Sequence, residues 1–159
     1  MIRVCFVCLG NICRSPTAEG IFRFLVAEAG LEAELEIDSA GTAGYHSGEP
    51  PDRRARAAGE RAGIPVGGQA RQFLVADFAR FDRVIAMDEN NVADLRRIAQ
   101  SPEQAGKISL LRSYDPAAAP NAPIPDPYYG DDRGFDEVLK LCRTACEHLL
   151  QEIRHEHQL

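Results

Sequence analysis

The sequence predicts an α/β fold in a single domain, with a four-stranded parallel sheet that carries helices on both faces. Short apolar runs rich in β-branched residues alternate along the chain with segments of helical periodicity, which is typical of a parallel sheet. The chain has 159 residues, of which 45% are hydrophobic and 26% charged, so it can bury one sizeable core. No repeat or low-complexity tract divides it, and we expect one domain over residues 1–159.

The elements can be placed in order along the chain. Apolar runs predict strands at Val4–Cys8, Leu35–Asp38, Arg83–Met87 and Ile108–Leu111. Helical periodicity predicts helices at Thr17–Ala29, Arg53–Ala62, Asn90–Ala99 and from Phe135 to about His155. The last helix has an apolar stripe that should cover one sheet face, formed by Val138, Cys142, Ala145, Leu149 and Ile153.

Charge, hydropathy and cysteine usage exclude several classes of protein. Lys plus Arg is 18 and Asp plus Glu is 24, so the formal charge is 18 − 24 = −6, and we expect no nucleic-acid partner. The apolar run at Val4–Leu9 leads into Gly10 and Arg14 instead of a cleavage site, so it should be a buried strand and not a signal peptide. No stretch approaches the ~20 apolar residues that span a bilayer. We expect a monomer in the reducing cytoplasm, without membrane contact.

The five cysteines should be free thiols. Their number is odd, and their spacing indicates neither a disulfide framework nor a zinc site. We therefore expect no metal site and no cofactor. Cys142 and Cys146 fall on the apolar stripe of the last helix, where they are most simply core residues.

Two segments interrupt the regular pattern: the glycine- and proline-rich stretch Gly41–Pro51 and the proline-rich loop Asp115–Gly130. A loop of the second length inside a compact domain is usually functional or disordered, and proline stiffens it. Ligands of doubly wound sheets bind beyond the carboxyl ends of the strands. This rule predicts one pocket formed by residues 8–15, 39–51 and 88–91 together with the proline-rich loop.

The segment Cys8–Pro16, CLGNICRSP, is the most informative part of the chain. Ser15 suits an N-cap and Pro16 the first helical position, so a helix should begin as the loop ends. Such a loop wraps its backbone N–H groups around an anion, and the helix N-terminus adds partial positive charge. We therefore predict a phosphate-binding loop after the first strand, made of Leu9, Gly10, Asn11, Ile12, Cys13, Arg14 and Ser15.

Cys8 and Arg14 are the predicted catalytic residues of this loop. Hydrogen bonds to the ionised sulfur and the charge of Arg14 should keep Cys8 a thiolate at neutral pH. The planar guanidinium can bind two phosphoryl oxygens and hold phosphorus in line with the sulfur. Attack by Cys8 would give a phosphocysteine intermediate.

The chain resembles the low-molecular-weight protein tyrosine phosphatases along nearly its whole length. The matching segments are VCLGNICRSP at Val7–Pro16, AEG at Ala18–Gly20, SAGT at Ser39–Thr42, HSGEPPDRRA at His46–Ala55, MDENN at Met87–Asn91 and DPYYG at Asp126–Gly130. The resemblance implies hydrolysis of phosphotyrosine on proteins and of small aryl phosphates, with inorganic phosphate or vanadate as inhibitors.

The resemblance also implies roles for single residues. Asp126 would be the general acid, and Asn11, Ser15 and Ser39 would support the loop and the thiolate. Tyr128 and Tyr129 would flank the pocket mouth. Tyr45 stands in a wall position where the family commonly has tryptophan. Arg53 stands where the family commonly has proline. An arginine-phosphate branch has threonine where this chain has Ile12, which favours phosphotyrosine. Cys13 would be the resolving thiol that traps oxidised Cys8, the alternative being simple packing.

Several positions have alternative interpretations from the residues alone. Asp126 could merely cap a turn, although its place in a stiff loop beside two tyrosines favours the acid. Asp88 could support the site or cap the helix that follows. His46 is the only candidate for a Cys–His pair, which a thiolate stabilised by an anion loop does not need.

Two other functions compete with the phosphatase. An arsenate reductase would need further cysteines that shuttle disulfides, whereas the spare pair here is predicted to lie in the core. A non-catalytic phosphate-binding or redox-sensing module would need no acid, so the set of Cys8, Arg14 and Asp126 argues against it.

Overall fold

Four parallel strands form the central sheet of this protein, for which a computed structural model describes residues 1–159. They are β1 (Ile2–Cys8), β2 (Leu35–Gly41), β3 (Arg83–Ala86) and β4 (Ile108–Leu110). The strand order is β2-β1-β3-β4, and each neighbouring pair is parallel. The predicted four-stranded parallel sheet is confirmed.

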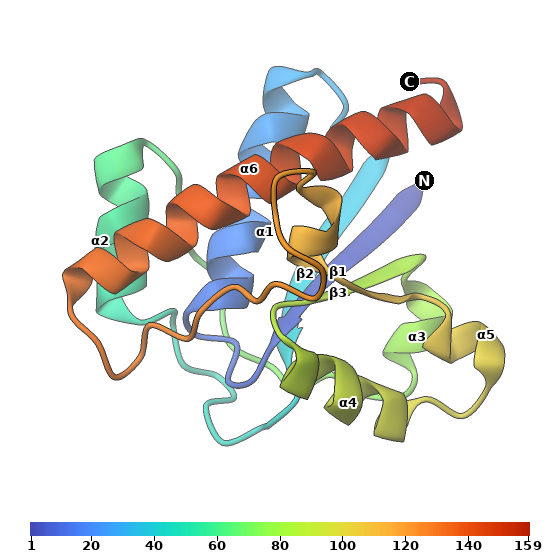
Figure 1. Ribbon diagram of the computed structural model, residues 1–159, viewed down its shortest axis with the longest axis horizontal. Helices are drawn as coiled ribbons and strands as arrows, with labels where there is room; N and C mark the ends of the chain where they lie inside the picture. The colour runs from blue at the N-terminus through green and yellow to red at the C-terminus, as the bar shows by residue number, and fades with distance from the viewer.

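Helices cover both faces of the sheet (Figure 1). On one face lie α1 (Arg14–Glu28), α2 (Arg53–Ala62) and the long α6 (Asp132–His157). On the other lie α3 (Asp77–Arg80) and α4 (Glu89–Ile98), with α5 (Pro102–Ala105) beside them. None of these helices combines the length and apolar composition that crossing a membrane requires.

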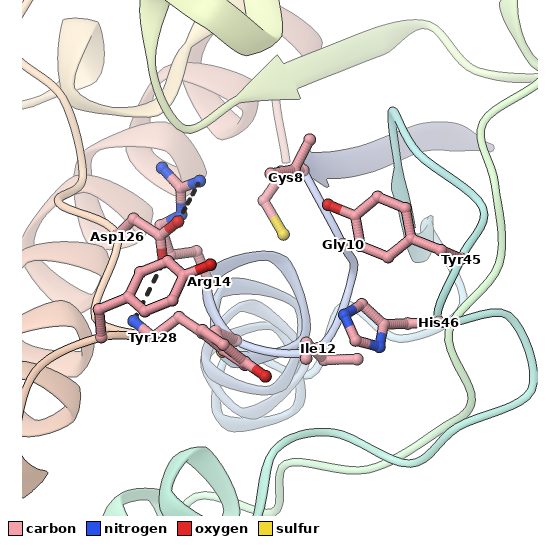
Figure 2. A pocket seen from close by; sticks show the side chains of 11 residues that line it. Cys8, Gly10, Ile12, Arg14, Tyr45, His46, Asp126 and Tyr128 are labelled. Carbon is pink, nitrogen blue, oxygen red and sulfur yellow. Dashed lines mark hydrogen bonds and ion pairs between the residues drawn. The ribbon is translucent and has the colours of Figure 1, made fainter.

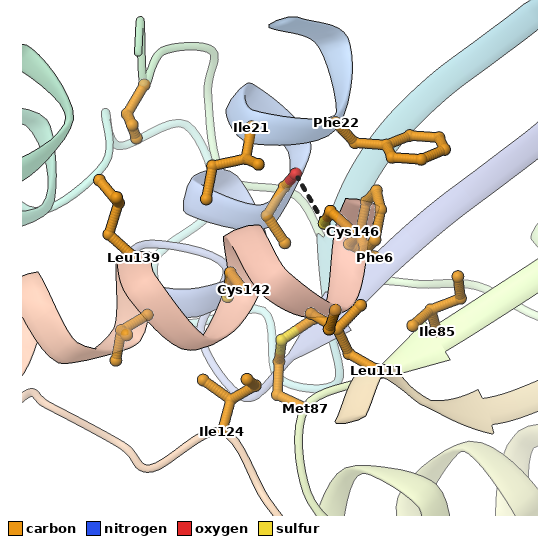
Figure 3. Close-up of a cluster of buried hydrophobic side chains, with 14 of the residues drawn as sticks. Phe6, Ile21, Phe22, Ile85, Met87, Leu111, Ile124, Leu139, Cys142 and Cys146 are labelled. Carbon is orange, nitrogen blue, oxygen red and sulfur yellow. Dashed lines mark hydrogen bonds between the residues drawn. The ribbon is translucent and has the colours of Figure 1, made fainter. Parts of the chain in front are cut away.

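The core is divided by the alternation of side chains along β1. Phe6 and Cys8 face the larger cluster under α1 and α6, whereas Cys5 and Val7 face the smaller cluster under α3 and α4. In the larger cluster the rings of Phe6 and Phe22 meet edge to face, with centroids 5.6 Å apart (Figure 3).

The apolar stripe predicted for the last helix is confirmed. All five of its residues are buried, and Cys142 and Cys146 have no exposed surface. Figure 3 shows both cysteines between α6 and α1, where the Cys146 Sγ lies 3.9 Å from the carbonyl oxygen of Ala18. The two thiols are core residues, as expected.

The observed elements differ from the predicted ones mainly at their ends. The first helix begins at Arg14 instead of Thr17, and the last begins at Asp132 instead of Phe135. Leu111 leaves the fourth strand and starts a 3₁₀ turn, η1 (Leu111–Tyr114). The short α3 and α5 were not predicted, because four residues do not establish a helical period.

Candidate active site

The loop between β1 and α1 leaves a run of backbone N–H groups without partners. None of the N–H groups from Leu9 to Ser15 donates a hydrogen bond within the protein. The carbonyl oxygens of Cys8 and Leu9 instead accept hydrogen bonds from the N–H groups of Thr42 and Ala43, both at 2.9 Å. These bonds turn the carbonyls outward, so the N–H groups remain available for an anion.

A chain of hydrogen bonds leads from a carboxylate to the sulfur of Cys8. Ser39 donates its hydroxyl to Glu19 at 2.6 Å, and the Asn11 amide nitrogen donates to Ser39 at 3.0 Å and to Ser15 at 2.8 Å. The Ser15 hydroxyl lies 3.0 Å from the Cys8 Sγ. Because Ser15 already accepts from Asn11, its own hydrogen can donate to the Cys8 sulfur.

Ser15 does not cap α1, and this prediction was wrong. The helix begins at Arg14, and its N-cap residue Cys13 makes no side-chain capping bond. Ser15 lies inside the first turn, fully buried, and its hydroxyl contacts Cys8 and Asn11. The sequence pattern was misread because the Ser15 hydroxyl hydrogen-bonds with Cys8 and Asn11 instead of with an N–H group at the start of the helix.

Arg14 extends from the first turn of α1 below the loop and is 3% exposed. One guanidinium nitrogen, Nη1, donates to Asp88 at 2.6 Å and to the carbonyl of Ile124 at 3.0 Å. Burial disfavours the charge, but the Cys8 thiolate and the hydrogen bond to Asp88 outweigh it and raise the pKa of Arg14. The other two nitrogens make no hydrogen bond within the protein, so they can hold two phosphoryl oxygens.

Asp88 fulfils both of the roles considered for it. One carboxylate oxygen accepts the N–H of Asn91 at 2.8 Å, and the Asn91 side chain accepts the Asp88 N–H at 3.2 Å, which completes a capping box on α4. The other oxygen accepts the hydrogen bond from Arg14. The start of α4 therefore orients the guanidinium of Arg14.

The proline-rich loop places Asp126 at the pocket. Ile124 and Pro127 are buried and hold the loop on either side of it, and the Ile124 N–H donates to the carbonyl of Met87 at 2.8 Å. One Asp126 oxygen accepts the Tyr128 N–H at 3.1 Å, and the other lies 3.9 Å from Arg14 Nη2. The carboxyl side chain is 44% exposed, so a leaving group can reach it.

These segments enclose a cavity of about 330 Å³ (Figure 2). Its lining residues are Cys8, Leu9, Gly10, Ile12, Cys13, Arg14, Tyr45, His46, Asp126, Tyr128 and Tyr129. In Figure 2 the sulfur of Cys8, the guanidinium of Arg14 and the carboxyl of Asp126 face the same space. Asn11, Ser15 and Ser39 lie behind the loop instead of in the cavity.

Residues 3–159 match the model of the family described as "Low molecular weight phosphotyrosine protein phosphatase". The chain belongs to the low molecular weight phosphotyrosine protein phosphatase family. It is a cysteine-dependent protein tyrosine phosphatase, as the sequence predicted, and its substrates are phosphotyrosine proteins.

This phosphatase has similar relatives in bacteria and animals. It is 48% identical to a low molecular weight protein-tyrosine-phosphatase of Streptomyces coelicolor, over 97% of this chain and 94% of the relative. It is 45% identical to the low molecular weight phosphotyrosine protein phosphatase of Homo sapiens, over 94% of both chains. The crystal structure of YfkJ from Bacillus subtilis superposes with a TM-score of 0.91 at 44% identity, covering 98% of this chain and 96% of that one.

Two further residues of the phosphatase contribute to the site: Glu19 was not predicted to, and His46 was considered only as a partner for Cys8 and within the pocket segment 39–51. Glu19 ends the hydrogen-bond chain behind Cys8, and His46 lines the cavity with its Nδ1 2.6 Å from Glu49. A Cβ at Gly10 would lie 3.0 Å from the His46 ring, so the glycine makes room for it. Both residues stand in segments that resemble the family, and that resemblance was the available signal.

Proposed function

We propose that Cys8 is the nucleophile, that Arg14 binds the phosphoryl group and that Asp126 is the general acid. The observation that carries this proposal is the set of unpartnered loop N–H groups around a thiol that faces Arg14. Donors fixed in this way stabilise the charge that develops on the transferred phosphoryl oxygens. Inorganic phosphate and vanadate should occupy the same loop and inhibit.

In the first step the Cys8 thiolate attacks phosphorus and an S–P bond forms. The bond between phosphorus and the tyrosine oxygen breaks, and its electron pair stays on that oxygen, which takes a proton from Asp126. In the second step Asp126, now a carboxylate, accepts a proton from water as the water oxygen attacks phosphorus. The S–P bond breaks, inorganic phosphate leaves, and Cys8 is again a thiolate.

The walls of the cavity support an aryl substrate. Tyr45 and Tyr128 present rings at its mouth, and Ile12 gives an apolar surface beside the phosphate loop. An aromatic ring gains from contact with such walls, whereas a guanidinium needs acceptors. We infer that phosphotyrosine is preferred over phosphoarginine. The five free thiols favour a reducing cytoplasm, and we propose that the protein acts there as a monomer.

Replacement of the nucleophile tests the central assignment. Cys8→Ser should abolish hydrolysis of p-nitrophenyl phosphate, assayed without added metal, because a hydroxyl is far less ionised than this thiol. Vanadate binding should remain, because the N–H groups and Arg14 are unchanged. Activity at or above a tenth of wild type, a barrier difference of roughly 1.4 kcal/mol or less, would refute the assignment.

Replacement of the acid tests the role of Asp126. Asp126→Asn should lower kcat on phosphotyrosine by roughly 10²–10⁴, because the phenolate then leaves without a proton. The loss should shrink as the leaving phenol becomes more acidic. A series of substituted phenyl phosphates measures this dependence, and equal losses across the series would indicate a structural role instead.

A further inference from the structure

Arg54 joins α2 to the loop that contains Asp126. Its Nη2 donates to the carbonyl oxygen of Tyr128 at 3.0 Å, and its Nη1 donates to that of Gly130 at 3.2 Å. The guanidinium also lies over two rings, with 4.5 Å to the centroid of Phe135 and 5.6 Å to that of Tyr128. One side chain therefore contacts the loop after Asp126 and the first turns of α6.

Asp52 holds the guanidinium of Arg54 in place. Its carboxylate accepts from Arg54 Nε at 3.1 Å and from Nη2 at 3.0 Å, and it also caps α2 by accepting the Arg54 N–H at 2.8 Å. The hydrogen bond from Arg54 lowers the pKa of Asp52 despite its partial burial, so the carboxylate is charged at neutral pH.

The same unit is attached to the phosphate-binding loop. The backbone N–H of Asp52 donates to the carbonyl oxygen of Ile12 at 2.7 Å. Asp52 and Arg54 therefore form a continuous polar connection between the loop that would hold the phosphoryl group and the loop that would hold the acid. The hydrogen bonds that Arg54 donates are charge-assisted, which makes them stronger than bonds between neutral groups.

The connection ends at Tyr128, which follows Asp126 by two residues and bonds to its carboxylate. Tyr128 donates its N–H to one Asp126 oxygen, and its carbonyl oxygen accepts from Arg54. A rotation of this residue would move the Asp126 carboxyl, and the arginine opposes that rotation. The Asp126 side chain is 44% exposed, so packing alone does not fix its position.

We propose that Arg54 is a positioning residue for Asp126. By fixing the backbone of Tyr128, Arg54 keeps the Asp126 carboxyl directed toward the leaving oxygen. This inference rests on the proposed acid role of Asp126. Arg54 touches neither the phosphoryl group nor the reacting atoms. A lysine cannot replace it, because one ammonium group lacks the planar fork that reaches both carbonyls and Asp52.

The test compares Arg54→Gln and Arg54→Lys with Arg61→Gln. Arg61 is the matched control because it also links α2 to α6, through an ion pair of 2.7 Å with Asp136 on the surface. Single-turnover rates are measured for phenyl phosphates of increasing leaving-group acidity, and vanadate inhibition reports on the phosphate loop. Each change is also made in the Asp126→Asn background, and thermal melts verify that every variant is folded.

Both Arg54 variants should lose roughly tenfold or more on phosphotyrosine and about twofold or less on a dinitrophenyl ester, since misplacing an acid affects only reactions that need the proton. Vanadate inhibition should stay within about twofold of wild type, and Arg61→Gln should behave as wild type in every assay. In the Asp126→Asn background Arg54→Gln should have no further effect, because an absent acid cannot be displaced.

Equal losses with all leaving groups, or full additivity with Asp126→Asn, would overturn the inference. If Asp126→Asn shows the expected leaving-group dependence and Arg54→Gln does not, the inference alone fails. If Asp126→Asn itself slows all substrates equally, the proposed acid and this inference fail together.

Discussion

The backbone of the loop between β1 and α1 depends on the side chain of Asn11. This residue has a φ of 57°, in the left-handed region that asparagine adopts more readily than most residues. Its amide nitrogen donates to Ser15 and Ser39, and its amide oxygen accepts the N–H of Arg71 at 3.0 Å. These bonds offset the backbone strain and hold the turn between β1 and α1.

Cys13 is a protonated thiol beside the proposed nucleophile. It lines the cavity, and burial, followed by the charges of Asp52 and Cys8, raises its pKa to about 12. At neutral pH it is therefore no competing nucleophile. Oxidation of Cys8 to a neutral sulfenic acid removes one of the charges that raise this pKa, so the Cys13 thiol then ionises more readily and still fits its predicted role as resolving cysteine.

Peroxide should inactivate the phosphatase reversibly. The Cys8 thiolate reduces hydrogen peroxide to water and becomes a sulfenic acid, and Cys13 then displaces water to form a disulfide. Dithiothreitol should restore activity. Cys13→Ser should recover poorly, because Cys8 is then open to further oxidation. Mass spectrometry of the oxidised protein measures the crosslink, and finding no bond between Cys8 and Cys13 would contradict the prediction.

At the scale of elements, the end of β2 and the start of α4 both contribute to the site. Gly41 ends β2 so close to the phosphate loop that a Cβ there would lie 2.7 Å from the Leu9 carbonyl oxygen. The start of α4 serves the same site through Asp88, which combines a cap with a contact to Arg14. Capping of α4 and the orientation of Arg14 are therefore coupled at one residue.

Two substitutions should separate the functions of Asp88. Asp88→Asn keeps an N-cap acceptor but removes the charge beside Arg14, so vanadate binding should weaken while stability changes little. Asp88→Ala removes the cap as well and should cost about 1 kcal/mol more in the free energy of unfolding. Urea unfolding and vanadate inhibition measure the two effects. If both variants were equally stable, the capping bond would contribute nothing measurable.

At the scale of the whole molecule, the core contains ionisable thiols. Cys5, Cys13, Cys142 and Cys146 are all buried, and burial raises the pKa of each, to about 12 for Cys13 and Cys142. In the unfolded chain these thiols ionise near their ordinary pKa of ~8.5. Their raised folded pKa therefore contributes stability that is fully present below the ordinary value and is lost as pH rises toward about 12.

Stability should consequently fall at alkaline pH in a way that depends on these thiols. Each should reduce the free energy of unfolding by up to about 1.4 kcal/mol per pH unit above its ordinary pKa. Cys142→Ala should be less stable than wild type at pH 7.5, because it leaves a cavity. Between pH 9 and 10.5, however, its free energy of unfolding should fall less than that of wild type, by the contribution of one thiol. Identical pH slopes for the two proteins would show that Cys142 contributes no such linkage.

The sequence by itself determined the periodic elements and the local chemistry of this phosphatase. Alternating apolar runs predicted the parallel sheet, and the stripe of α6 predicted its buried cysteines, because burial imposes a period on the chain. The segment from Cys8 to Arg14 indicated an anion loop, because its members are close in sequence. The resemblance to the family indicated Asp126 as the general acid, a role that no local sequence pattern assigns to it.

Only the tertiary structure decided how distant residues act on one another. The sequence predicted Ser15 as a helix cap, yet its hydroxyl hydrogen-bonds with the Cys8 sulfur, which the fold brings beside it. The sequence assigned no role to Arg54, yet the fold places it between Asp52 and the carbonyl oxygens of a loop more than 70 residues away. Such partners have no sequence period, since hydrogen bonds between separate segments depend on where the packed core brings those segments together.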